Sequence, residues 1–166
     1  MSDEFQLKSM SIGAVDKALE RAEHYRLLND PAQAESVCLD VLEVDPENQR
    51  CLTVLLLAMT DQFVEGAPHA GEKKTREYLG RMKDEYRRVY YTGIVHERKA
   101  RAFLARGLSG VFAYESFVEA MAWYEKAEPL RPAGTDDPIL RWNNCVRSIQ
   151  RRNLRPIEDH WEQPLE

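Results

Sequence analysis

Apolar residues recur at intervals of three and four positions along most of the chain, which is the spacing of one face of an α-helix. Residues 12–29 show this pattern first, and the same spacing predicts further helices over 31–44, 48–63, 72–91, 93–106, 112–130 and 137–152. No segment alternates apolar and polar residues between turn signals, as a half-buried strand would. The sequence therefore predicts an all-α fold of about seven helices.

Proline and glycine mark the expected helix boundaries. An aspartate that caps a helix, followed by a proline in the first turn, is a typical helix start. Such Asp-Pro pairs begin at Asp30, Asp45 and Asp137. Residues 64–71 hold two glycines and one proline and are expected to form a loop, as are residues 107–110. Thr92 and Gly93 predict a weak break between the fourth and fifth helices.

Two segments of the chain, 32–48 and 118–134, match each other when they are aligned on their closing prolines. The matching positions are Ala34 and Ala120, Cys38 and Tyr124, Val41 and Ala127, and Pro46 and Pro132. Small residues at this spacing let the two helices of a hairpin approach closely. In these features the chain resembles tetratricopeptide repeat proteins, with about three degenerate repeats over residues 12–135.

The resemblance implies a stack of antiparallel helix hairpins, an α-solenoid, in which the helix over 137–152 caps the open end. Trp142 is expected to pack against the preceding hairpin, while Arg141, Arg147 and Arg151 face water. We expect three segments along the chain: a flexible N-terminus over 1–11, a helical domain over 12–153 and a polar tail over 154–166.

A stack of this kind also implies a function, because its concave face holds a peptide or a helix of another protein. In the family, four positions in the first helix of each repeat line this face. Here those positions hold Asp16, Leu19, Glu23, Arg26, Arg50, Thr53, Leu57, Thr60, Ile94, Glu97, Arg101 and Leu104. Some family members grip the C-termini of chaperones with a clamp of lysine, asparagine and arginine. Only Arg98 agrees with that clamp, so it is not expected here.

The composition, with 43% apolar and 31% charged residues, is that of an ordinary globular chain. No window approaches the ~18 uninterrupted apolar residues of a transmembrane helix. The acidic start of the sequence lacks the apolar core of a secretory signal. We therefore expect a cytoplasmic protein that does not enter a membrane.

Charge is unevenly distributed within the net charge of −5. Residues 1–65 hold 5 basic and 13 acidic residues, residues 66–110 hold 11 and 5, and residues 111–166 hold 7 and 10. The acidity of the whole chain argues against a dedicated nucleic-acid binder. The asymmetry nevertheless leaves open a second hypothesis, a nucleic-acid-associated regulator. It would use the basic segment 73–106 and the C-terminal arginines Arg147, Arg151, Arg152 and Arg155.

Residue types that serve catalysis and metal binding form no known motif in this sequence. The three cysteines are spaced too widely for a metal knuckle or a disulfide framework, and the histidines show no metal-ligand spacing. These histidines are His24, His69, His96 and His160. The sequence also lacks glycine-rich phosphate loops and nucleophile motifs. It therefore predicts a protein-interaction module with no enzymatic activity, no cofactor and no metal.

Overall fold

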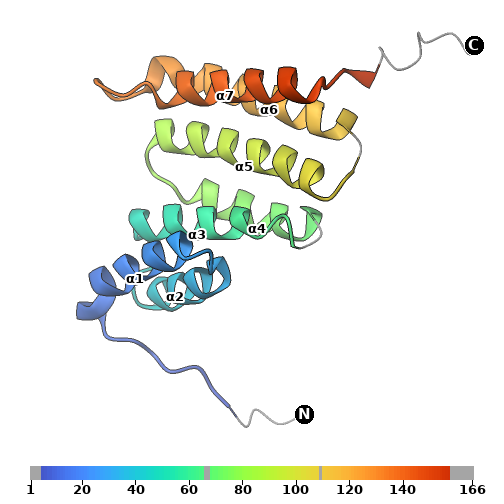
Figure 1. Cartoon of the computed structure of the whole chain (residues 1–166). Coiled ribbons are helices and arrows are strands. Elements are labelled where there is room, and N and C mark those ends of the chain that lie inside the picture. Colours follow the sequence, from blue (N-terminus) through green and yellow to red (C-terminus); the bar gives the residue numbers. More distant parts are fainter. Residues whose placement is uncertain (1–4, 66–67, 109, 158–166) are drawn as a thin grey trace, which may run out of the picture. The chain divides into compact units, whose positions relative to one another are not determined.

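The structure, a computed structural model, describes residues 5–65, 68–108 and 110–157 (Figure 1). These residues form seven α-helices and two short 3-10 helices, and they contain no strand. The α-helices are α1 (Val15–Leu27), α2 (Pro31–Val44), α3 (Gln49–Asp61), α4 (Pro68–Gly80), α5 (Glu85–Ala105), α6 (Gly110–Ala127) and α7 (Asp137–Arg152). The 3-10 helices are η1 (Ile12–Ala14) and η2 (Glu128–Leu130). The prediction of an all-α fold with seven helices is confirmed for the described part of the chain.

The chain divides into two compact units, Met1–Gln62 and Phe63–Glu166, and each is described by itself. In the first unit α1 packs on α2, α2 packs on α3, and α1 also contacts α3. In the second unit α5 packs extensively on α6, α6 packs on α7, and α4 contacts α5. The solenoid arrangement and the single helical domain over 12–153 stay predictions. Residues 1–4, residues 158–166 with His160, and the side chain of His69 lie outside the described part.

The helix starts follow the predicted capping chemistry at α2 but differ at α3 and at α7, where Asp136 precedes the helix without a side-chain capping bond and Asp137 is its first residue. The Asp30 side chain accepts a hydrogen bond from the Gln33 amide at 3.3 Å, and Pro31 opens α2 as predicted. At the start of α3, however, the capping residue is Asn48, whose side chain accepts from the Cys51 amide at 2.8 Å. Asp45 instead ends α2 and accepts a hydrogen bond from the Asn48 side chain at 2.9 Å.

Small residues are buried between the packed helices of the first unit. Ala22 of α1 and Ala34 of α2 are completely buried, as is Cys38 one turn further along α2. The Cys51 thiol donates a hydrogen bond to the Cys38 carbonyl at 3.3 Å and thereby joins α3 to α2. Since both cysteines are buried and form no disulfide, they pack as small apolar residues, as their positions in the sequence pattern suggest.

The predicted break at Thr92 and Gly93 is wrong, because α5 runs through both residues without interruption. The chain turns earlier, after Gly80, where the Arg88 guanidinium donates to the carbonyls of Met82 at 2.7 Å and Lys83 at 2.9 Å. These bonds satisfy carbonyls in the turn between α4 and α5.

Gly93 serves helix packing. A Cβ atom at this position would lie 2.6 Å from Cε1 of Tyr124 in α6. Only glycine allows the Tyr124 ring to lie this close to the α5 backbone, so the residue marks a close approach of two helices and not a helix end.

Candidate functional site

Several expected groove residues meet where α1 contacts α3 in the first unit. Glu23 accepts two hydrogen bonds from the Arg50 guanidinium, at 2.9 and 3.0 Å. This bonding is the largest cause that lowers the pKa of the Glu23 carboxyl. One turn along, Arg26 donates to the Asp61 carboxylate at 2.7 Å. The predicted residues Glu23, Arg26 and Arg50 therefore share a face, but they bond across it to each other and to Asp61.

Other expected groove residues are buried, which corrects their assignment to an open binding face. Leu19 is completely buried in α1, and Thr53 is 8% exposed and donates its hydroxyl to the Gln49 carbonyl. Thr60, Ile94 and Glu97 are also buried. The reason is that α1, α3 and α5 turn these positions toward neighbouring helices. The exposed or half-buried members are Asp16, Glu23, Arg26, Arg50, Leu57, Arg101 and Leu104.

Glu97 of the second unit accepts several hydrogen bonds, and its side chain is only 1% exposed. It accepts hydrogen bonds from the Tyr124 hydroxyl of α6 at 2.5 Å and from the Asn144 amide of α7 at 3.0 Å. Arg101 donates to it at 2.5 Å within α5, and Arg141 of α7 at 3.4 Å. This junction joins three helices around one carboxyl group.

Burial at the junction alters the ionisation of its neighbours. Desolvation is the main cause that raises the pKa of the Tyr124 hydroxyl, and the charge of Glu97 raises it further. Desolvation, followed by Glu97, also raises the pKa of Cys145 to about 12. Both groups are therefore uncharged at neutral pH. The junction lacks an activated nucleophile, and its donors already satisfy the carboxyl group, so its evident role is to hold the helices together.

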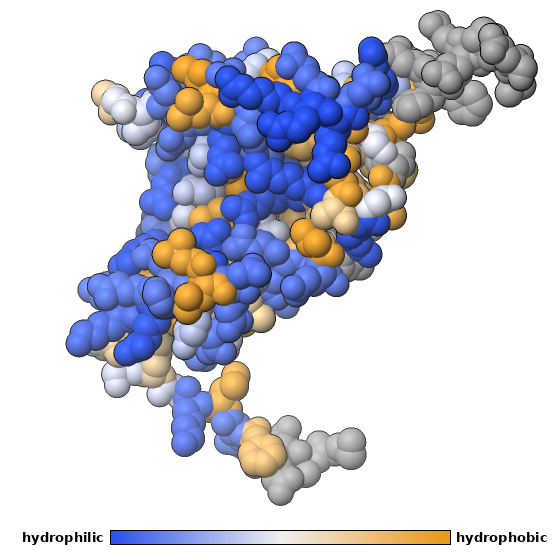
Figure 2. Space-filling view, viewed as in Figure 1, coloured by the Kyte–Doolittle hydropathy of each residue, from blue (hydrophilic) through white to orange (hydrophobic). Residues whose placement is uncertain are grey.

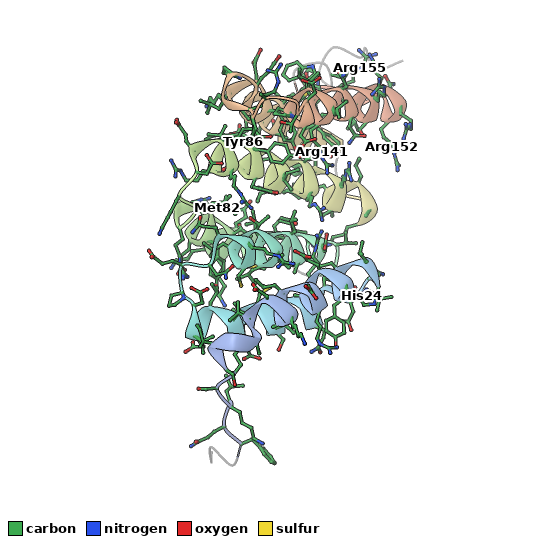
Figure 3. All side chains as sticks on the ribbon, turned by 90° about the vertical axis from the view of Figure 1, so that its left-hand side faces the viewer. His24, Met82, Tyr86, Arg141, Arg152 and Arg155 are labelled. Atoms are coloured by element: carbon green, nitrogen blue, oxygen red, sulfur yellow. The ribbon has the colours of Figure 1, made fainter. Side chains whose placement is uncertain are left out.

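The position of Arg141 differs from expectation. It was expected to face water, but Figure 3 shows it between the ribbons of α5 and α7, where it donates to Glu97. Arg147 and Arg151 are exposed, as predicted. Trp142 is half-buried and lines a small hollow with Tyr124 of α6, in agreement with the expected packing of α7 on the preceding hairpin.

A hollow of the second unit, which we call the α4–α5 pocket, has a volume of about 480 Å³. Its lining comes from α4, α5 and one residue of α6. The lining residues are Glu72, Thr75, Arg76, Leu79, Gly80, Arg88, Val89, Thr92, Val95, His96 and Trp123. The floor is apolar, because leucine and valine side chains and the Trp123 ring supply much of it.

Most polar groups of the α4–α5 pocket are bonded to the protein itself. The Thr75 hydroxyl donates to the Glu72 carbonyl, and the Thr92 hydroxyl donates to the Arg88 carbonyl at 2.6 Å. The Glu72 carboxylate forms an ion pair with Lys99. Desolvation lowers the pKa of His96, which favours its neutral form. Arg76 has no bonded partner among the described residues. The pocket thus combines an apolar floor with the exposed guanidinium group of Arg76.

Sequence reasoning missed this pocket because periodicity assigned Leu79 and Val89 to a core stripe and could not show that the neighbouring helix leaves a hollow beside them. Trp123 stands beside Tyr124 and so points away from the core face of its helix. A large aromatic residue outside the apolar stripe is a signal that would have drawn attention to this surface.

Comparison with known proteins identified no relative of this chain. No protein-family model matches the chain, and neither a curated protein nor a solved structure matches it. None of the described helices is long and apolar enough to cross a membrane. Within the described ranges, no three side chains of the types His, Cys, Asp and Glu gather in a way that could hold a metal ion.

Proposed function

We propose that the protein is a non-enzymatic, cytoplasmic interaction module of tetratricopeptide-like hairpins, and that its α4–α5 pocket binds a helix or an extended segment of another protein. The observation that carries this proposal is the pocket itself, about 480 Å³ of open space over an apolar floor. This volume lies within the ~300–1,000 Å³ that ligand pockets typically occupy. An apolar side chain of a partner would gain about 1.5–3 kcal/mol by full burial there.

The pocket is a better candidate than the face where α1 contacts α3. A partner at that face would have to compete with the Glu23–Arg50 and Arg26–Asp61 ion pairs, whose members already satisfy each other. At the pocket a partner displaces only water from apolar groups and breaks no internal ion pair. The free energy of binding there can come from burial of apolar surface.

The groups around the pocket also favour binding over catalysis. His96 has a lowered pKa but no carboxylate or hydroxyl bonded to its ring in the described structure, and the Glu72 carboxylate is engaged by Lys99. A general base needs a nucleophile or a substrate proton within hydrogen-bond reach, and it gains from a third group that orients it. No such arrangement occurs among the described lining residues.

The nucleic-acid alternative is weakened over the basic segment 73–106. Lys99 pairs with Glu72, Arg101 pairs with Glu97, and Arg88 is bonded to backbone carbonyls. The nearby rings of Tyr86 and Tyr90 stack on each other with centroids 5.7 Å apart, so they serve internal packing. The nucleic-acid alternative also invokes the arginines of α7, and binding at these arginines needs a separate test.

The proposal can be tested by filling the pocket. Gly80 lines it, and a Cβ atom at Gly80 would meet no atom within 4 Å, so Gly80→Trp adds bulk without disturbing the core. Gly13→Trp is the matched control, since Gly13 has equally open space in the first unit. Trp123→Ala, which removes one wall of the pocket, is a second variant.

The measurement is selection from a displayed library of amphipathic helices on the folded full chain. We expect the wild type and Gly13→Trp to enrich the same helices, with large apolar anchors, and both pocket variants to lose them. Equal enrichment on Gly80→Trp and the wild type would show that the helices bind elsewhere, and would overturn the assignment of this pocket.

A further inference from the structure

A second, smaller cleft of about 180 Å³ lies on the second unit, where the C-terminal ends of α5 and α7 meet over α6. We call it the arginine cleft. Its lining residues are Arg101, Leu104, Ala105, Phe117, Ser148, Arg151 and Arg152. Three guanidinium groups thus surround a hollow that has room for about one large side chain.

The positive charges of the arginine cleft are poorly neutralised by the protein. Arg151 and Arg152 are exposed and form no bond with any described residue, and Arg147 one turn earlier is in the same state. Arg101 pairs with Glu97, but 47% of its side chain is exposed. Figure 2 shows strongly hydrophilic side chains gathered over the C-terminal half of α7, and Figure 3 shows Arg152 at its end.

Like charges held close together repel each other, so this arrangement costs free energy until an anion binds. Guanidinium groups are suited to carboxylates because their N–H donors form a planar fork. Residues 63–157 as a whole carry 18 basic against 12 acidic residues. The field around the arginine cleft therefore attracts an acidic partner.

The floor of the cleft distinguishes between kinds of anion. Its accessible apolar surface comes from Leu104 and Ala105, while the Ser148 hydroxyl donates to its own helix at the Asn144 carbonyl. Phe117 is completely buried, so its ring offers no exposed face on which a nucleic-acid base could stack. An apolar floor below a rim of arginines fits an apolar side chain that is flanked by carboxylates.

We propose that the arginine cleft binds an acidic peptide segment of a partner protein, with one large apolar side chain in the cleft and carboxylates on Arg151 and Arg152. The inference rests on the proposed role as an interaction module. It names a second contact and the chemistry of the partner at that contact. Two features support the proposal: the arginines of the cleft are complementary in charge to an acidic segment, and the floor of the cleft is apolar.

The test uses the full chain and a short fluorescent peptide of glutamate and glycine around one tryptophan. The variant is Arg151→Glu with Arg152→Glu, and the matched control is Lys17→Glu with Arg21→Glu, which reverses two exposed charges on α1. We expect the variant to weaken peptide binding by at least about tenfold, because two charge-assisted contacts become repulsive, and the control to change it little. Equal binding by the variant and the wild type would overturn the proposal.

Exchanging the charges of both the cleft and the peptide tests whether charge recognition, and not misfolding of the variant, explains the loss of binding. The same peptide with lysine in place of glutamate should bind the Arg151→Glu, Arg152→Glu variant and not the wild type, since the rim of the cleft then carries the opposite charge. Failure of this exchange in a folded variant would count against the proposal. Gly80→Trp should leave binding of the acidic peptide unchanged, so the two sites can fail independently.

Two further experiments test whether the cleft is instead occupied by a nucleic acid or by the protein's own acidic residues. If oligothymidylate binds more tightly than the acidic peptide and loses binding in the same variant, the cleft is a phosphate site and the proposal is wrong.

A second experiment tests whether the protein's own acidic residues occupy the cleft. It neutralises acidic residues near the end of the sequence, with Glu158→Gln, Asp159→Asn and Glu162→Gln in one full-length chain. If the peptide binds only to this chain, the occupant is the protein's own segment, and the partner proposal is overturned.

Discussion

The hydroxyl of Tyr124 donates a 2.5 Å hydrogen bond to the carboxyl group of Glu97, and the two residues belong to different helices of the second unit. The same Tyr124 ring lies against Gly93, one turn before Glu97 in α5. A glycine on α5, a tyrosine on α6 and a carboxyl group that α7 also reaches therefore form one packing unit. The stability of the second unit should be most sensitive to substitutions there.

Removal of the Glu97 carboxyl group should destabilise the second unit strongly. Glu97→Ala leaves the Tyr124 hydroxyl and the Arg141 guanidinium without their shared acceptor, and breaking a buried ion pair in this way typically costs about 3–5 kcal/mol. Glu97→Gln keeps an acceptor oxygen and should cost less. The free energy of unfolding from urea titration measures both, with Glu125→Gln on the exposed side of α6 as the control. A loss for Glu97→Ala no larger than that of the control would contradict this role.

Gly93→Ala should destabilise the protein although alanine is the better helix former. The added Cβ atom would lie 2.6 Å from the Tyr124 ring, and overpacking of this kind costs about 1–3 kcal/mol. Gly80→Ala is the matched substitution in open space and should be neutral or stabilising by up to about 1 kcal/mol. The melting temperature should therefore fall for Gly93→Ala and stay unchanged or rise for Gly80→Ala. A stabilised Gly93→Ala chain would refute the close approach of α5 and α6.

Enlargement of Ala120 should also overpack the second unit. Ala120 is completely buried in α6, whereas Ala122 in the same helix is exposed. Ala120→Leu should cost about 1–3 kcal/mol because the neighbouring helix must shift, and Ala122→Leu should change stability little. Denaturant unfolding compares the pair. If both variants unfolded at the wild-type midpoint, Ala120 would not be a close-contact position, and its place in the repeat alignment would be wrong.

The Glu23–Arg50 ion pair should add a small, pH-dependent contribution to stability. Arg50 lowers the pKa of Glu23 below the ordinary value of 4.5, so the folded state favours the charged carboxylate. This contribution is present above pH 4.5 and is lost as the pH falls through the lowered value in the folded state. Both side chains are about 40% exposed, so the pair contributes at most about 1 kcal/mol.

The pH dependence can be isolated by comparing Arg50→Gln with the wild type at two pH values. The wild type should be slightly more stable at pH 7, and the difference between the two chains should vanish in acid. High salt should also reduce this difference, because the pair is exposed to solvent. A difference that grows as the pH falls would contradict the sign of the Glu23 shift.

Local sequence signals identified features that depend on neighbours along the chain. The spacing of apolar residues predicted seven helices, since the period of 3.6 residues is imposed by the backbone itself. The capping role of Asp30 followed from its side chain and the proline after it. Spacing along one helix put Glu23 and Arg26 on one side of α1, whereas the resemblance to tetratricopeptide repeats added Arg50 of α3 to the same face.

Long-range packing decided the features that such signals misjudged. Gly93 reads as a helix break in the sequence, but the Tyr124 ring, 31 positions away by residue number, makes it an interior position of α5. Glu97 reads as a solvated groove residue, yet donors from α6 and α7 bury its carboxyl group. The partner of a side chain on another helix cannot be deduced from periodicity, because periodicity assigns a face but not what covers it.

For the two candidate binding surfaces, too, the sequence predicted the general role and the tertiary structure determined the location. Helical periodicity and the resemblance to tetratricopeptide repeats predicted an all-α chain with an interaction role, and charge counting located a basic region. The α4–α5 pocket and the arginine cleft arise only where helices diverge and leave apolar floors uncovered. How closely two helices pack depends on the side chains of both, so these hollows are a property of the tertiary structure and not of any one segment.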